Sequence, residues 1–333
     1  MHSDQRLGLL QDWLARRFAK GSFSLTPASE DASFRRYFRI SADGRSWIVM
    51  DAPPECEDCR PFVRVAALMR AAGLNVPEVL AQDLDRGFLL LTDLGTTTYL
   101  QALNEANADE LFGDAIDVLL RLQIASRPGV LPAYDEALLQ RELALFPDWY
   151  IGRHLGVELS DEQRRVLAEI TALIVANNLA QPSVFVHRDY MPRNLMVTDP
   201  NPGVLDFQDA VFGPITYDVV SLFKDAFVSW DEECVLDWTV RYWEKAKRAG
   251  LPVNADFGEF YRGFEWMGLQ RHLKVLGIFA RINYRDGKPG YLADAPRFVR
   301  YVRSVCGRYS ALAPLARLFD QIENRNAAAG YTF

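Results

Sequence analysis

The 333-residue sequence is poor in lysine, in cysteine and in long apolar runs. Only six of its 37 basic residues are lysine, and none lies between Gly21 and Phe223. Arginine must therefore supply nearly all the positive charge of that region. Four cysteines are too few for a disulfide framework, and the single CxxC pair, Cys56 and Cys59, lacks the second pair that a structural zinc site needs.

The charge and hydropathy of the chain exclude several classes of protein. No apolar run approaches the roughly 18 residues of a membrane span, and residues 1–20 lack the continuous apolar stretch of a signal peptide. The 37 basic and 44 acidic residues give a net charge of -7, so no global positive field attracts nucleic acid or anionic lipid. We expect a soluble cytoplasmic protein, monomeric, that binds neither membranes nor nucleic acid.

The first ninety residues are typical of a small sheet. Residues 33–40 and 46–50 are rich in aromatic and β-branched side chains, and the turn at residues 42–44 predicts a hairpin between them. Apolar residues at helical spacing follow from Phe62 to Met69, and Gly73 ends that helix. Residues 77–81 and 88–91 predict two further strands.

From Thr96 onward helical periods predominate. They predict helices over residues 110–124, 137–149, 161–178, 216–228, 232–249 and 259–281. Short apolar runs interrupt them, and the turn-rich residues 199–202 join two of these runs, 195–197 and 203–205, into a hairpin. The predicted fold class is α+β: a small β-rich N-terminal lobe, residues 1–95, and a larger, mainly helical C-terminal lobe, residues 96–333.

Two motifs in the interrupting stretch carry chemistry. Residues 187–194 read HRDYMPRN and residues 205–209 read LDFQD, which resemble the catalytic-loop and metal-binding motifs of kinases. Asp189 would orient an attacking hydroxyl and accept its proton. Asn194 and Asp206 would offer amide and carboxylate oxygens to Mg²⁺.

A simpler interpretation is that these residues only cap turns, as Asp and Asn often do in loops. The order and spacing of a base and two metal ligands favour the catalytic interpretation. We expect His187 to orient the loop through a backbone hydrogen bond, Asp218 to tie the loop to the core from its helix, and Tyr217 to lie in the core.

The motifs identify a resemblance to the aminoglycoside phosphotransferase and choline kinase family, which has the two-lobed protein-kinase-like fold. Residues 87–95 resemble the strand and hinge that bind adenine in that family, which implies Leu91, Thr92 and Asp93 as nucleotide-binding residues. The family implies ATP and Mg²⁺. Residues 187–196 and 50–55 further resemble the bacterial anomeric kinases of N-acetylmuramate and N-acetylglucosamine, which act in peptidoglycan recycling.

The sequence departs from the protein-kinase pattern in its phosphate-binding elements. It has no G-x-G-x-x-G; residues 28–33 stand in its place, with Ser33 as a candidate phosphate contact. The third-strand lysine is also absent. Because arginine binds phosphate oxygens bidentately, Arg36 and Arg39 are candidates for its replacement, although solvated strand charges are an equal alternative.

Substrate recognition is expected in the helical lobe. The aromatic face of Trp149 would suit the apolar side of a sugar ring, and Arg271, His272 and Lys274 would suit the carboxylate of N-acetylmuramate. Asp209 would bind a sugar hydroxyl or assist the metal. The alternatives are a core tryptophan and a basic helix face.

We therefore predict an ATP-dependent small-molecule kinase acting on the anomeric hydroxyl of an amino sugar. An aminoglycoside or another small alcohol is the alternative acceptor. A nucleotide-binding pseudokinase acting as an interaction module is the alternative from another class, motivated by the missing lysine and by DFQ in place of DFG.

Overall fold

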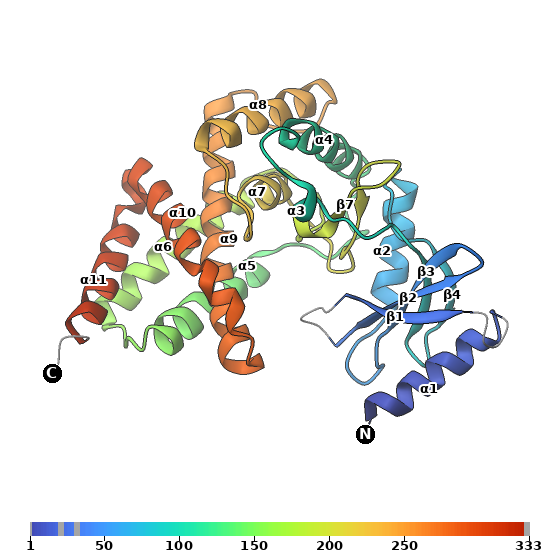
Figure 1. Ribbon diagram of the computed structural model, residues 1–333. Helices are drawn as coiled ribbons and strands as arrows, with labels where there is room; N and C mark the ends of the chain where they lie inside the picture. Colours follow the sequence, from blue (N-terminus) through green and yellow to red (C-terminus); the bar gives the residue numbers. More distant parts are fainter. Residues whose placement is uncertain (1, 19–22, 30–33, 330–333) are drawn as a thin grey trace. The chain divides into compact units, whose positions relative to one another are not determined.

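The computed structural model describes residues 2–18, 23–29 and 34–329 (Figure 1). The chain divides into two compact units, each built from two segments. The first unit comprises Met1–Leu122 and Pro192–Ala210, and the second comprises Gln123–Met191 and Val211–Phe333. The predicted lobe boundary after residue 95 falls inside the first unit. The α+β class is confirmed, because the first unit holds a five-stranded sheet and the second is mainly helical.

The sheet of the first unit is antiparallel throughout, with the strand order β1-β2-β3-β5-β4. Its strands are β1 (Ser24–Ser29), β2 (Arg36–Ala42), β3 (Arg45–Asp51), β4 (Val79–Asp83) and β5 (Phe88–Thr92). The predicted β2–β3 hairpin is confirmed: its two turn residues, Asp43 and Gly44, both have positive φ, as the tightest hairpin turns require.

Helix α1 (His2–Ala15) packs on one face of this sheet. Its Leu10, Trp13 and Leu14 are buried against a strand set that includes Val49 and Phe88. Because side chains alternate across a strand, the neighbours of Val49 and Phe88 along β3 and β5 point to the face of the sheet opposite α1. Helix α2 (Arg60–Ala71) is the predicted helix of this region.

The first unit also contains the short helix α3 (Tyr99–Ala102), most of α4 (Ala108–Ile124) and the hairpin of β7 (Leu195–Met196) and β8 (Gly203–Val204). The β7–β8 pairing is antiparallel, which confirms the hairpin predicted over residues 195–205. This hairpin brings the two predicted metal-binding segments to the same place in the unit.

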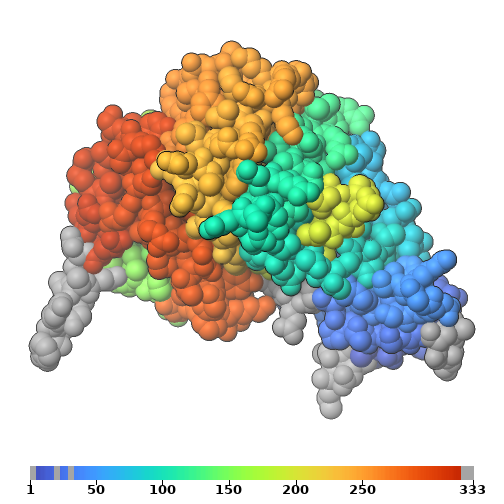
Figure 2. Space-filling model, turned by 45° about the horizontal axis from the view of Figure 1, so that its top comes forward, coloured from blue at the N-terminus to red at the C-terminus, as the bar shows by residue number. Residues whose placement is uncertain are grey.

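The second unit is organised around α9 (Phe257–Asp286), a helix of 30 residues that is buried on nearly all sides from Phe260 to Ala280 (Figure 1). A Cβ at Gly277 would lie 2.4 Å from the backbone of Leu145, so only glycine allows this close approach. The elements that contact α9 include α5 (Glu136–Leu143), α6 (Asp161–Leu179), α7 (Tyr217–Phe223), α8 (Glu232–Arg248) and α10 (Ala295–Arg308). Helix α11 (Ala313–Ala329) packs on α10 and α6. Figure 2 shows the chain from α8 onward, orange to red, forming much of the visible surface of this unit.

Two predicted helices of the second unit differ from the observed ones. The helix predicted over residues 137–149 is α5 followed by a π-helix, Phe146–His154, that packs along α9. The helix predicted over residues 216–228 is shorter, because α7 ends at Phe223. In the part of the chain that the structure describes, none of the helices combines the length and apolar character that a membrane crossing needs.

Candidate active site

The predicted catalytic loop, residues 187–191, follows strand β6 (Ser183–Val186) in the second unit. The N–H groups of His187 and Arg188 donate to the carboxylate of Asp218 at 2.6 and 3.0 Å. Asp218 is fully buried in α7, and this burial raises its pKa to about 7 even though the two N–H groups favour its charged form. The expectation that Asp218 ties the loop to the core is confirmed.

The backbone around Asp189 is held by contacts within the loop. The Asp189 N–H donates to Nδ1 of His187 at 3.2 Å, which confirms the orienting role expected of this histidine. The Asp189 carbonyl accepts from the Met191 N–H at 3.0 Å. Both backbone polar groups of the predicted base are thus used locally.

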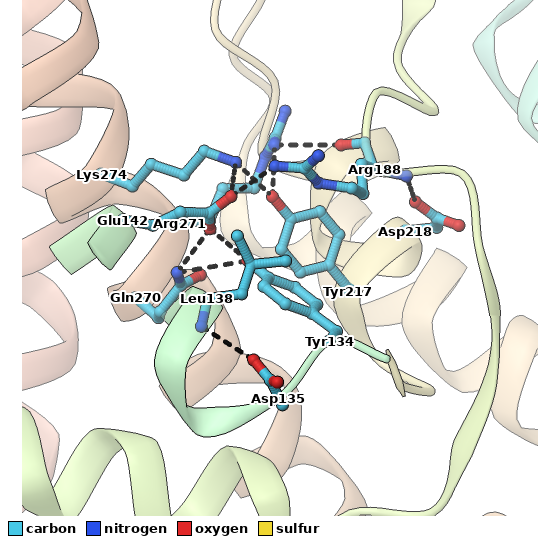
Figure 3. A network of polar contacts seen from close by, with 10 residues as sticks. All are labelled: Tyr134, Asp135, Leu138, Glu142, Arg188, Tyr217, Asp218, Gln270, Arg271 and Lys274. Atoms are coloured by element: carbon cyan, nitrogen blue, oxygen red, sulfur yellow. Dashed lines mark hydrogen bonds and ion pairs between the residues drawn. The ribbon is translucent and has the colours of Figure 1, made fainter. Parts of the chain in front are cut away.

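Arg188, directly before Asp189, is held at three points. Its N–H donates to Asp218, its carbonyl accepts from Arg271 Nη1 at 3.3 Å, and its guanidinium pairs with Glu142 at 2.5 Å (Figure 3). Its φ of 76° lies in the left-handed region, which a non-glycine residue rarely holds unless its surroundings impose it.

Glu142, on α5, is the centre of a buried polar network in the second unit (Figure 3). It accepts hydrogen bonds from Lys274 at 2.9 Å, from Gln270 at 3.0 Å, and from Arg188 and the Tyr134 hydroxyl. Burial opposes its charge, but Lys274 and Arg188 hold the pKa of Glu142 down at about 2. We call Glu142 and these four hydrogen-bond donors the Glu142 network.

The three basic residues predicted on α9 do not act together. Arg271 and Lys274 are both buried and both donate to the hydroxyl of Tyr217, at 3.3 and 3.0 Å. His272 instead stacks on Tyr301 with ring centroids 4.8 Å apart. Burial lowers the pKa of His272 well below its usual value, so this histidine is neutral. Tyr217 is buried, as expected, but it also has this polar role.

Trp149 lies on the π-helix and lines an open groove of about 520 Å³ in the second unit. The groove is also lined by Asp148, Arg153, Tyr284 and Arg285. Its size is within the range of small-ligand sites. Its walls carry the aromatic rings of Trp149 and Tyr284 and three charged side chains.

The two predicted metal ligands are neighbours in the first unit. Asn194 ends a short 3₁₀ turn before β7, and Asp206 follows β8. The Leu205 N–H donates to the Asn194 carbonyl at 2.9 Å, and the Asn194 amide donates to the Asp206 carboxylate at 3.3 Å. Next to Asp206, Phe207 is buried against Phe62 of α2 at 4.8 Å between ring centroids, which fixes the segment.

The carboxylate and amide oxygens of Asp206 and Asn194 fit Mg²⁺, which binds one or two carboxylates together with phosphate and water oxygens. Over residues 2–18, 23–29 and 34–329, no three His, Cys, Asp or Glu side chains form a metal-binding group. A cation held by Asp206 and Asn194 would therefore take its remaining ligands from phosphate and water. Asp209 accepts from Gln208 at 3.5 Å, and Gln208 also donates to Asp206 at 2.8 Å.

Both arginines predicted to replace the third-strand lysine bind carboxylates of the sheet. Arg36 bonds Asp51, a fully buried carboxylate that Arg6 also bonds. Arg39 bonds Asp93 at 2.7 Å and the Gly95 carbonyl at 2.7 Å.

The predicted hinge residues, Leu91, Thr92 and Asp93, lie at the end of β5. Leu91 is buried and paired with Ile48, and the Thr92 N–H donates to the Glu78 carbonyl at 3.0 Å. Asp93 is the carboxylate that binds Arg39, and this ion pair helps to lower its pKa despite burial. Ser33 lies outside the described residues.

Sequence reasoning missed Glu142 and Arg35. Nothing in the local sequence marks Glu142, because three of its four donors, Arg188, Gln270 and Lys274, come from distant segments. Arg35 stands next to Arg36 at the start of the second strand, and its side chain bonds Glu57 at 3.3 Å. The scarcity of lysine favours an arginine, and the sequence offers Arg36 and Arg39 as the candidates.

Comparison with known proteins gives a consistent result. Residues 24–251 match the model of the phosphotransferase enzyme family. The N-acetylmuramate/N-acetylglucosamine kinase of Pseudomonas aeruginosa is 60% identical over 298 residues, covering 90% of this chain and 88% of the relative. The protein of the same name from Neisseria meningitidis is 50% identical over 335 residues, covering 99% and 100%.

Among solved structures, a choline/ethanolamine kinase family protein from Mesorhizobium loti is similar with a TM-score of 0.64 at 15% identity, covering 94% of this chain and 99% of that one. At this identity the likeness shows the fold alone. It confirms the kinase-like fold expected from the sequence.

Proposed function

Because the chain belongs to the phosphotransferase enzyme family, we propose that it is an ATP-dependent kinase for the anomeric hydroxyl of N-acetylmuramate and N-acetylglucosamine. The observation that carries the proposal is the similarity to relatives named as such kinases, at 50% to 60% identity over at least 88% of either chain. The motif residues Asp189, Asn194 and Asp206 are all present.

In the proposed reaction Asp189 orients the sugar hydroxyl and accepts its proton while the oxygen attacks the γ-phosphorus of ATP. The bond between the γ-phosphorus and its bridging oxygen breaks, ADP leaves, and the sugar becomes a 1-phosphate. A base in this role must keep one position. The contacts of His187, Arg188 and Asp218 within the second unit supply that rigidity.

Asn194 and Asp206 would hold Mg²⁺ through their amide and carboxylate oxygens. When bound, the ion would neutralise charge on the phosphates of ATP. The hydrogen bonds between the segments of Asn194 and Asp206 support the assignment, because they keep the two oxygen donors together.

For the sugar, we propose Trp149 as the aromatic face that packs on the ring. Asp209 is the candidate partner of a sugar hydroxyl. Arg271 and Lys274 are buried and bonded around Tyr217, so they would act on the acceptor through their positive field, which favours an acceptor carrying a carboxylate.

The test is an acceptor panel read by ³¹P NMR. The protein is incubated with ATP, Mg²⁺ and amino sugars, aminoglycosides or choline, and each new phosphate is located. We expect acid-labile sugar 1-phosphate from N-acetylmuramate and N-acetylglucosamine, and none from their methyl glycosides, whose anomeric oxygen is blocked. Phosphate on another acceptor, on the methyl glycosides, or on none would contradict the proposal.

A further inference from the structure

The first unit must bind a polyanion almost without lysine. Its two segments, residues 1–122 and 192–210, contain one lysine, Lys20, which lies outside the described residues. The triphosphate of ATP carries more negative charge than one Mg²⁺ neutralises. An arginine is therefore needed, and its planar fork can bind two phosphate oxygens at once.

Two arginines of β2 are already bound to carboxylates. Arg36 and Arg6 converge on Asp51, each with Nε 3.0 Å from a carboxylate oxygen. Arg39 makes two bonds to Asp93, at 2.7 and 3.1 Å. Paired forks of this kind fix an arginine to the sheet, and a phosphate would have to compete with a carboxylate for the same donors.

Arg35 lies in a different environment, directly before β2. Its guanidinium bonds Glu57 at 3.3 Å, and the Tyr37 side chain is a further hydrogen-bond partner. The Arg35 and Glu57 side chains are 12% and 21% exposed. Glu57 precedes α2, the helix whose Phe62 packs on Phe207. Arg35 and Glu57 thus border the same end of α2 as the Asp206–Phe207 segment.

Electrostatics agree with this placement. Burial opposes the charge of Arg35, yet its pKa is raised, and the neighbours that raise it include Tyr37, Glu57 and Asp206. Asp206 is close enough for its charge to act on the Arg35 guanidinium. A phosphate bound through a cation at Asp206 would lie within reach of the same guanidinium.

From this geometry we infer that Arg35 binds phosphate oxygens of the nucleotide in place of the missing lysine, with Glu57 as the carboxylate that orients its guanidinium. The inference rests on the proposed use of ATP. It assigns to Glu57 the positioning role and to Arg35 the direct contact. It predicts that the contribution of Arg35 to binding depends on the phosphates and not on the nucleoside.

The experiment compares Arg35→Gln with Arg60→Gln, which removes the same charge from an exposed arginine paired with Asp58 at the start of α2. Calorimetry measures binding of a non-hydrolysable ATP analogue with Mg²⁺, and of adenosine. We expect Arg35→Gln to weaken analogue binding about 10- to 100-fold, the loss typical of a charged hydrogen bond. Adenosine binding should stay within about twofold, and Arg60→Gln should behave as wild type.

Two further variants keep the test decisive. Arg35→Lys retains a charge without the fork and should bind the analogue with intermediate affinity, and Glu57→Gln should weaken it less than Arg35→Gln does. In steady-state kinetics we expect Arg35→Gln to have a raised KM for ATP and an unchanged KM for the sugar. Wild-type affinity for the analogue in folded Arg35→Gln would overturn the inference.

Failure of the proposed function would look different. If the wild type binds the analogue but phosphorylates no sugar, the proposed function fails and the binding comparison still tests Arg35. If the wild type phosphorylates the sugar and Arg35→Gln has an unchanged KM for ATP, only the inference about Arg35 fails.

Discussion

Replacing Glu142 by glutamine removes the only carboxylate of the Glu142 network while keeping its shape. The network holds the pKa of Glu142 at about 2 instead of its usual 4.5. At about 1.4 kcal/mol for each pKa unit, the folded protein favours the charged carboxylate by about 3 kcal/mol more than the unfolded chain does. Breaking a buried ion pair costs a similar amount, about 3–5 kcal/mol, because Lys274 and Arg188 would be left without their partner.

Urea unfolding at several pH values measures this energy. A carboxylate with a lowered pKa stabilises the fold above its unfolded-state pKa and loses that effect as the pH falls toward the folded value. Glu142→Gln should therefore be about 3 kcal/mol less stable than wild type from pH 7 to about pH 5, with a difference about 1 kcal/mol smaller at pH 3.5.

The matched control is Glu136→Gln, on the exposed face of the same helix, which should change stability by less than about 0.5 kcal/mol. A loss below about 1 kcal/mol for Glu142→Gln at pH 7, or a difference that is the same at pH 3.5, would refute the account of the network.

Two other changes test the packing and the loop. Arg188→Gly accepts the φ of 76° without strain but loses the contact with Glu142. We expect kcat to fall about tenfold or more with an unchanged KM for ATP. An unaltered kcat would show that the Arg188 side chain does not position the loop. Gly277→Ala places a Cβ 2.4 Å from the Leu145 backbone and should lower the free energy of unfolding by about 2 kcal/mol or more in thermal unfolding. The control Gly290→Ala meets no atom within 4 Å and should leave stability unchanged. Equal stability of the two variants would contradict the packing of α9 on Leu145.

Local signals predicted much of the fold. The turn at Asp43 and Gly44 and the turn-rich residues 199–202 each produced the hairpin expected of them. Helix α1 was not predicted, although Leu10, Trp13 and Leu14 have the spacing of a buried helical face. The π-helix after α5 follows from packing against α9, which no local pattern in the sequence reports.

The site shows the same division between local and distant information. Asp189, Asn194 and Asp206 could be proposed because each lies in a short motif typical of kinases. The sequence offered Arg36 and Arg39 as phosphate-binding arginines and did not consider Arg35. The carboxylate partner of each arginine could not be predicted, because it depends on which side chains meet across the sheet or at the start of α2. Strand alternation gives the face of a side chain but not its partner.

A similar limit applies to the basic residues of α9. Their spacing suggested one cationic cluster, but Arg271 and Lys274 face Tyr217 while His272 stacks on Tyr301. Helical periodicity separates neighbouring positions onto different faces, and only the packing around α9 shows which face meets the catalytic loop.

The central claim is that Asp189 is the base of a sugar kinase, and the most direct measurement is the turnover of Asp189→Asn with N-acetylmuramate. Asparagine keeps the size of the side chain but cannot accept the proton. We predict a loss of kcat of about a hundredfold or more, with affinity for the ATP analogue within about twofold of wild type. Asp237→Asn, an exposed carboxylate of α8, is the control and should keep full activity. Near-normal turnover by Asp189→Asn would contradict the account.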